Sequence, residues 1–206
     1  MIRPRFPSRR LFAGLVTAAT VVWWPGPADA HLVTTGLGPV YDGISHVLIS
    51  PDDLLPVLVM GLLAGLNGPK TGRRVMFTLT LAWLSGGLAG LVVGHPSVPS
   101  GVTAMSSLVL GGLTAADRRL PPSVAMAIAL AVGLLHGWVN GAAIAEAQRE
   151  PLGLIGIVSA IFVLVAMVGA FAVSVRAAWA RVAVRIAGSW VAAIGLLMLG
   201  WSLRPI

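Results

Sequence analysis

The feature that most constrains this chain is a series of long apolar runs separated by short charge clusters and by proline and glycine breaks. The runs fall at residues 53–68, 74–94, 101–116, 122–145, 152–175 and 183–203. The chain is 57% hydrophobic and only 10% charged, which is too little charge to cover a water-facing surface. Because lipid offers no partners to backbone polar groups, such runs fold as helices. The sequence therefore predicts an all-α membrane bundle of about six transmembrane helices, forming one domain over residues 31–206.

The first 30 residues are typical of a secretory signal peptide. Basic residues come first, namely Arg3, Arg5, Arg9 and Arg10. An apolar run from Leu11 to Trp24 follows, and Ala28-Asp29-Ala30 places small residues at the two positions that define a cleavage site. The apolar run is too short to cross about 30 Å of hydrocarbon as an uncleaved anchor helix. We therefore expect cleavage of residues 1–30, so that the mature chain begins at His31.

A shorter apolar stretch, from Pro39 to Ile49, precedes the first long run. It is too short to span a membrane and is interpreted as an interfacial or re-entrant helix. The next segment, Ser50-Pro51-Asp52-Asp53, combines an N-cap residue, a proline at the first helical position and acids in the first turn. A new helix is therefore expected to begin near residue 51.

The basic residues also predict how the helices are oriented. If the mature N-terminus is outside, the inner loops carry Lys70, Arg73, Arg74, Arg118, Arg119, Arg176, Arg181 and Arg185. Only Arg149 and Arg204 then lie outside. Since Lys and Arg are enriched in cytoplasmic loops, we expect a multi-pass protein of the bacterial inner membrane with both mature termini in the periplasm. The dispersed basic clusters form no continuous patch, so a nucleic-acid partner is not expected.

A few ionisable residues lie in or beside the apolar runs, where they are costly and usually mark a pathway or a site. They are Asp42, His46, Asp52, Asp53 and His136. Several of them also have purely structural interpretations. Asp52 and Asp53 can favour the helix dipole, and His136 can be a core histidine bonded to a carbonyl. Asp42 either caps a short helix that starts at Gly43 or orients the imidazole of His46.

In the expected topology all four histidines lie in the outer half of the protein, namely His31, His46, His95 and His136. His31 would carry the new amino terminus, and an amine beside an imidazole can chelate a metal ion. His95 is interpreted as a loop residue. Because the chain has no cysteine, a metal site must use imidazole, carboxylate or another oxygen.

Two motifs resemble those of the HupE/UreJ family of nickel and cobalt permeases. His46, five residues, Asp52 and Asp53 resemble the family's H-x5-D-H motif. The string Leu135-His136-Gly137-Trp138-Val139-Asn140-Gly141-Ala142-Ala143 is similar to the second motif, F-H-G-x-A/V-H-G-x-E. The chain departs from the family at three potential ligand positions, with Asp53 and Asn140 in place of histidines and Ala143 in place of the glutamate. The resemblance implies uptake of a divalent ion, Ni²⁺ or Co²⁺, from the outer side.

The expected metal site consists of His46, Asp52, Asp53 and His136, with Asn140 one turn beyond His136 on the same helix face. Imidazoles with oxygen donors suit Ni²⁺. Exchanging imidazole for carboxylate and amide is expected either to shift the preference toward Co²⁺, Mn²⁺ or Fe²⁺ or to weaken binding enough for release of the ion. The secondary candidates are His31 and Asp42. A face of small residues, Gly133, Gly137 and Gly141, is expected to let the segment bearing His46 and the two acids approach closely.

The leading hypothesis is a secondary permease whose partners are the lipid bilayer and the transported ion, with no permanently bound cofactor. No G-x-x-x-x-G-K-[ST] motif is present, so no nucleotide is expected. The alternative is a non-transporting membrane accessory factor for assembly of a metalloenzyme such as a hydrogenase or urease. An enzyme is not expected, because no serine lies in a Gly-x-Ser-x-Gly elbow and H-E-x-x-H is missing. The sequence is compatible with a monomer and with a homo-oligomer.

Overall fold

The computed structural model describes residues 34–94 and 98–204. The predicted signal peptide and its cleavage site lie outside the described residues, and so do His31 and His95. Every described residue belongs to one compact unit, Leu32–Ile206.

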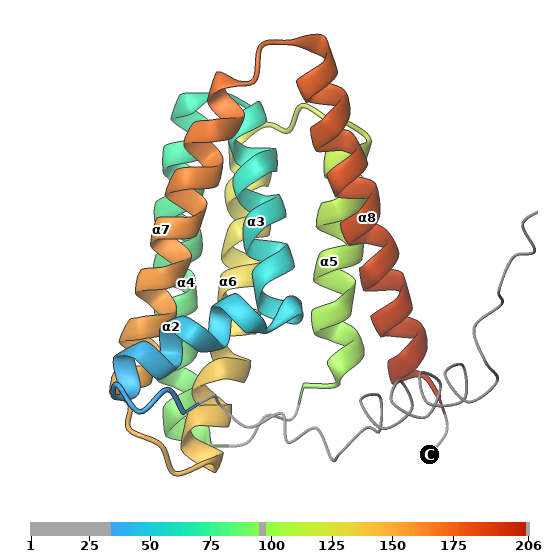
Figure 1. Cartoon of the computed structure of the whole chain (residues 1–206). Helices are drawn as coiled ribbons and strands as arrows, with labels where there is room; N and C mark the ends of the chain where they lie inside the picture. Colours follow the sequence, from blue (N-terminus) through green and yellow to red (C-terminus); the bar gives the residue numbers. More distant parts are fainter. Residues whose placement is uncertain (1–33, 95–97, 205–206) are drawn as a thin grey trace, which may run out of the picture. The chain divides into compact units, whose positions relative to one another are not determined.

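The described residues form α-helices joined by short loops, with no strand among them, which confirms the predicted all-helical fold (Figure 1). The helices are α2 (Pro39–Ile49), α3 (Pro51–Leu66), α4 (Pro69–Val93), α5 (Ser100–Ala115), α6 (Pro122–Glu146), α7 (Leu152–Ser174) and α8 (Ala178–Ser202). Each long helix corresponds to one apolar run of the sequence.

Four of these helices, α4, α6, α7 and α8, are long and apolar enough to cross a membrane. The pair α2 and α3 passes the same test only when taken together, and it is bent by 75°. Helix α5 has 16 residues, or about 24 Å at 1.5 Å per residue, which is less than the hydrocarbon thickness of about 30 Å. Length and composition therefore support four spans, or five if the bent pair counts as one. The six-span count stays a prediction.

The helix starts follow local sequence signals. Helix α3 has Ser50 at its N-cap and Pro51 as its first residue, as predicted. Helix α2 begins at Pro39, after Gly38 with φ 104°, because the fixed φ of proline suits the first helical position. The predicted cap at Asp42 was wrong, since Asp42 already lies inside the first turn of α2.

Consecutive helices from α3 to α8 run in alternating directions. The connections α3–α4, α5–α6 and α7–α8 lie at one end, at the top of Figure 1, and the connection α6–α7 lies at the other. The eight basic residues expected on the inner side fall in or just after the three connections of the first end. The charge asymmetry inferred from the sequence therefore separates the two ends of the bundle.

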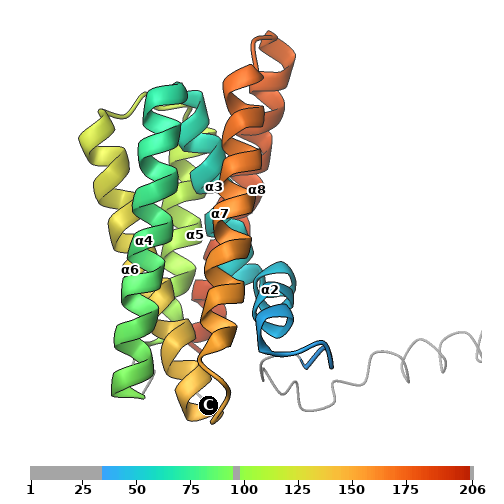
Figure 2. The ribbon, with the colours of Figure 1, turned by 90° about the vertical axis from the view of Figure 1, so that its left-hand side faces the viewer.

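Helices α4 and α6 pack with their backbones in direct contact, side by side in Figure 2. A Cβ atom at Gly137 or Gly141 would overlap the backbone of α4 at Trp83 or Gly87. The glycine face of α6 was expected to receive the segment that carries His46 and the acids, and this expected partner was wrong. The glycines instead fix α6 against α4, which places Trp83 beside the polar residues of α6.

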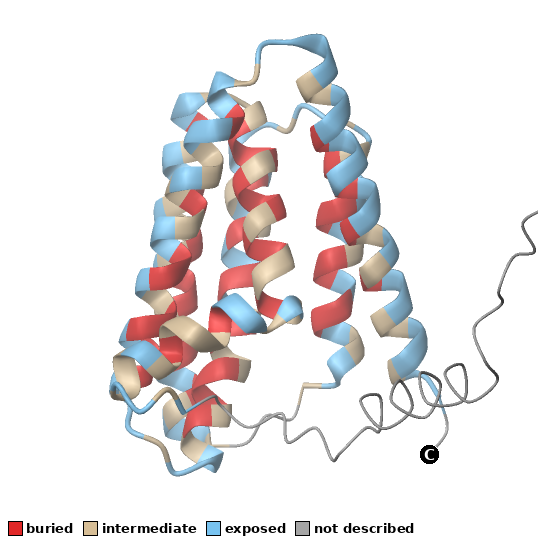
Figure 3. Ribbon diagram, viewed as in Figure 1, coloured by how far each residue is buried: buried red, intermediate tan, exposed pale blue. Residues whose placement is uncertain are grey.

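Helix α3 packs against α7, α5 and α4, and its buried residues face inward (Figure 3). Helix α8 packs mainly on α5 and also exposes large apolar side chains. These include Trp179, Trp190, Leu197 and Trp201. An outward surface of this kind fits a lipid environment, because lipid does not penalise exposed apolar groups.

Candidate metal site

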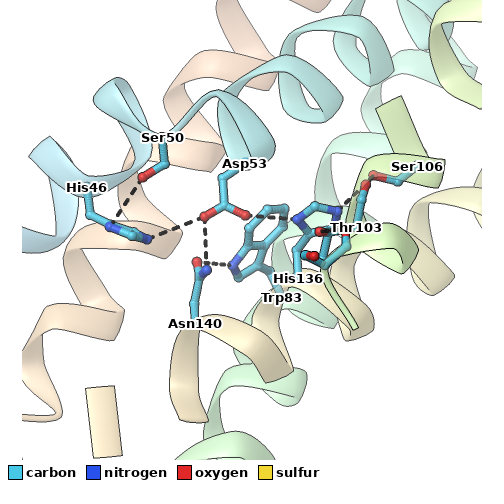
Figure 4. A network of polar contacts seen from close by, with 9 residues as sticks. His46, Ser50, Asp53, Trp83, Thr103, Ser106, His136 and Asn140 are labelled. Atoms are coloured by element: carbon cyan, nitrogen blue, oxygen red, sulfur yellow. Dashed lines mark hydrogen bonds and ion pairs between the residues drawn. The ribbon is translucent and has the colours of Figure 1, made fainter. Parts of the chain in front are cut away.

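A buried carboxylate lies in the first turn of α3. Asp53 is only 2% exposed, and its two oxygens face two side chains of α6 (Figure 4). Oδ1 lies 2.8 Å from Nδ1 of His136, and Oδ2 accepts a hydrogen bond of 2.9 Å from Nδ2 of Asn140. His136 and Asn140 are four residues apart on one helix, so one carboxylate reaches both.

A second imidazole approaches the same carboxylate from α2. Nε2 of His46 lies 3.5 Å from Oδ2 of Asp53, and its Nδ1 lies 3.4 Å from Oγ of Ser50. The chain bends by 75° between α2 and α3, and His46, near the end of α2, lies within reach of Asp53 at the start of α3. Both of these contacts are longer than those of His136, and the His46 side chain is 17% exposed whereas that of His136 is 1% exposed. His46 is therefore the looser and more accessible of the two histidines.

Two further helices complete the surroundings of His136 and Asn140. The indole N–H of Trp83, on α4, donates to Oδ1 of Asn140 at 3.2 Å, and the Trp83 ring lies 5.2 Å from the ring of His136. Oγ of Ser106, on α5, lies 2.9 Å from Nε2 of His136 and donates to the carbonyl of Thr103 at 2.6 Å. The sequence pattern does not identify Trp83 or Ser106 as part of the site. The available signal for Trp83 is that a buried indole needs an acceptor for its N–H.

Asp52 lies apart from this network. It is half-buried and lines a cavity of about 380 Å³ between α3, α5 and α8. The other residues around this cavity are Ser100, Thr103, Leu197, Met198, Trp201 and Ser202. Neighbouring residues of an α-helix point about 100° apart, which sends the side chains of Asp52 and Asp53 toward different neighbours. The structure thus brings His46, Asp53, His136 and Asn140 together and places Asp52 beside them.

Comparison with known proteins agrees with this arrangement of motifs. Residues 19–198 match the HupE / UreJ protein family, which is most of the chain. The chain belongs to the HupE/UreJ family. It is 25% identical over 190 residues to "Protein HupE" of Rhizobium leguminosarum bv. viciae, which covers 91% of this chain and 98% of that protein. No solved structure matches the chain.

In this HupE/UreJ protein Asp42 does not orient His46, and that expectation was wrong. One carboxylate oxygen of Asp42 accepts hydrogen bonds of 2.6 Å from both the backbone N–H and the hydroxyl of Thr35. The other lies 3.9 Å from Nη1 of Arg149, which also donates to Thr34 at 2.8 Å. Asp42 and Arg149 therefore join the segment before α2 to the α6–α7 connection.

In the described part of this HupE/UreJ chain, no group of three or more His, Asp or Glu side chains is arranged to hold a metal ion. The network is instead closed by hydrogen bonds to Asp53. Its spacings are nevertheless close to those around an ion. Two donors that each lie about 2.1 Å from one metal ion are about 3.0–3.4 Å apart at octahedral to tetrahedral angles. The separations between Asp53 and the two histidines, 2.8 and 3.5 Å, lie on either side of that range.

Proposed function

We propose that this protein is a secondary permease that takes up a divalent transition-metal ion, Ni²⁺ or Co²⁺, from the outer side of the membrane. The observation that carries the proposal is the buried carboxylate of Asp53, which faces His136 from α6 and His46 from α2. Membership of the HupE/UreJ family supports a metal-related role. The proposed role is transport, and no catalytic residue is assigned.

The proposed ligands are His46, Asp53 and His136. Imidazole nitrogen suits Ni²⁺, and a carboxylate between two imidazoles supplies the negative charge that a divalent ion requires. An ion at Asp53 takes over the role of the hydrogen-bond donors that now compensate its charge. Because a transported ion must leave as well as enter, the ligand set needs only modest affinity.

Asp52 is proposed to act earlier than these ligands. Its carboxylate lines a cavity next to the site, together with hydroxyl groups of α5 and α8. A negative charge in a cavity raises the local concentration of cations. We therefore assign Asp52 to the capture of the ion and Asp53 to its coordination.

The proposal includes the topology. The six spans follow from the apolar runs, the outer termini from the distribution of basic residues, and the cleaved signal peptide and inner-membrane location from the N-terminal segment. A reporter fused after Arg119 should be cytoplasmic, and one fused after Arg204 should be periplasmic. Sequencing of the mature N-terminus should begin at His31. Two reporters on the same side of the membrane would refute the six-span topology.

Uptake of labelled Ni²⁺ and Co²⁺ into vesicles that contain the purified protein tests the transport role directly. Vesicles with the parental protein should accumulate the ion, and those with Asp53→Asn should match empty vesicles. Trp190→Phe is the control, because Trp190 is exposed on α8. Equal accumulation by protein-containing and empty vesicles would contradict the permease. If enzyme maturation in cells still required the protein, the accessory-factor alternative would then hold.

A further inference from the structure

The amide of Asn140 is held from two opposite sides. Its Oδ1 accepts the hydrogen bond from Nε1 of Trp83 at 3.2 Å, and its Nδ2 donates to Oδ2 of Asp53 at 2.9 Å. All three residues are buried, at no more than 3% exposure. Burial limits competition from bulk water, so each partner constrains which end of the amide it meets.

The chemistry of the two partners fixes the orientation of the amide. The indole N–H is only a donor, and an ionised carboxylate is only an acceptor. A half-turn of the amide would set its NH₂ against the N–H of Trp83 and its oxygen against the carboxylate of Asp53. Both of these pairs repel, whereas the observed orientation satisfies both. Trp83 therefore keeps the amide oxygen of Asn140 directed away from Asp53.

We propose that Trp83 is a specificity-determining residue that excludes the oxygen of Asn140 from the metal's coordination shell; this rests on the proposed metal site at Asp53. With the oxygen excluded, the nearest groups around an ion at Asp53 are two imidazoles and one carboxylate. Imidazole favours ions such as Ni²⁺, and carboxylate or carbonyl oxygens favour ions such as Mn²⁺. Trp83 thus keeps the ligand set rich in nitrogen.

Removing the indole N–H should release this constraint. In Trp83→Phe the aromatic ring beside His136 remains, but the donor to Asn140 is lost. The half-turn of the Asn140 amide is then opposed only by repulsion between its oxygen and the carboxylate of Asp53. A cation bound between the two oxygens removes this repulsion, because both oxygens can coordinate it. The amide is then free to add an oxygen ligand. Trp83 acts through Asn140 and is a positioning residue in this sense.

The test measures dissociation constants of Ni²⁺ and Mn²⁺ for the purified full-length protein in detergent. Trp83→Phe should lower the preference for Ni²⁺ over Mn²⁺ by a factor on the order of ten, which corresponds to the free energy of about one hydrogen bond. The matched control, Trp190→Phe, should leave the preference unchanged, since Trp190 is exposed on α8. In an Asn140→Ala background, Trp83→Phe should change the preference less than about twofold, because the effect needs the amide.

An unchanged preference in Trp83→Phe would overturn the proposal. An equal change in the Asn140→Ala background would also overturn it, because Trp83 would then act through packing alone. Asn140→Asp provides a test that leaves Trp83 intact, since it must direct one oxygen toward Asp53. It should shift the preference toward Mn²⁺, and no shift would show that an oxygen already faces the ion. Vesicle uptake is measured separately, so that loss of transport with this binding pattern intact contradicts the permease and not the role of Trp83.

Discussion

Asp52 and Asp53 are adjacent in the sequence, yet they lie in different parts of the molecule. Asp53 is buried among α2, α3 and α6, where donors face both of its oxygens. Asp52 lines a cavity between α3, α5 and α8 and keeps part of its surface accessible. The difference arises because helices that are distant in the sequence cover each side of α3. A motif can therefore identify the turn that carries a site without identifying which of its acids is enclosed.

The two environments suit two different tasks. A buried charge is tolerated only when partners compensate it, and Asp53 has its partners fixed by α6. A partly exposed carboxylate beside a cavity attracts ions without holding them tightly. The predictions below test this division of roles, from the largest expected effect to the smallest.

Of the exchanges Asp53→Asn and Asp52→Asn, the first should cause the larger loss in the free energy of unfolding. It removes the charge that His136 and Asn140 surround, and breaking such a buried interaction costs about 3–5 kcal/mol. The matched exchange Asp52→Asn should lower the free energy of unfolding by less than about 1 kcal/mol, because its site is partly exposed. Denaturation of the two variants in detergent measures both values. Equal losses would remove the distinction between the two carboxylates.

His136→Ala should reduce uptake more than His46→Ala. His136 contacts Asp53 at 2.8 Å and is fully enclosed, whereas His46 lies at 3.5 Å and is partly exposed. Loss of His136 should lower the uptake rate by more than the factor of about 10–100 that outer partners of a metal ligand contribute. Western blots of membranes establish that both variants are inserted at parental levels. A larger defect in His46→Ala would place the main ligand on α2.

Asp52→Asn should change the concentration dependence of uptake and leave the maximal rate intact. Loss of a capturing charge lowers the local ion concentration, so that KM should rise by about tenfold with kcat unchanged. Initial uptake rates over a range of Ni²⁺ concentrations separate the two constants. A lower kcat with the same KM would move Asp52 into the coordination step and would unite the two acids in one role.

The smallest effect is expected at the opposite end of the bundle. The guanidinium of Arg181 donates to both oxygens of Asp117, at 2.7 and 3.0 Å, and holds the pKa of that carboxyl below its ordinary value. Because the pair is partly exposed, Asp117→Asn should lower stability by less than about 1 kcal/mol. It serves as the surface reference against which the loss at Asp53 is measured.

The pH dependence of this reference has a definite sign. A carboxyl whose pKa is lowered by folding stabilises the protein above its unfolded pKa of about 3.9, and this contribution is lost as the pH falls through the folded value. The stability difference between the parental protein and Asp117→Asn should therefore be full at neutral pH, begin to fall near pH 4 and disappear only below the lowered folded pKa of Asp117. A difference that grows with acidification would show that Arg181 does not act on Asp117 in this way.

Local signals in the sequence predicted much of the fold. The Ser-Pro-Asp-Asp segment gave the start of α3, and the apolar runs gave the long helices close to their observed bounds. The grouping of His46, Asp53 and His136 came from motif resemblance, and the structure places them in contact. The helix starts and bounds depend on spacing along one segment, which a single sequence contains, whereas the grouping of residues from separate helices rested on the resemblance.

The other contacts between distant helices could not be predicted. Trp83 and Asn140 are 57 positions apart, and nothing in either helix indicates the other as its partner. Helix α6 is apolar around most of its circumference, so its glycine face carries no sign that α4, rather than α3, covers it. In a membrane the hydrophobic pattern no longer separates inside from outside, and the choice among packing faces depends on the close fit of backbones.

The chain bends by 75° at Ser50, between α2 and α3, and this bend lies next to the site. His46 is four residues from Ser50, about 6 Å along the helix, so that a rotation of α2 by about 20° at the bend would move His46 by about 2 Å. Where α2 crosses α7, Gly43 and Gly156 let the two backbones approach so closely that a Cβ atom on either glycine would overlap the other helix. Asp53 and His136 lie on the other side of the bend, on α3 and α6. A different angle at the bend would therefore change the distance of His46 from Asp53 without any change in α6.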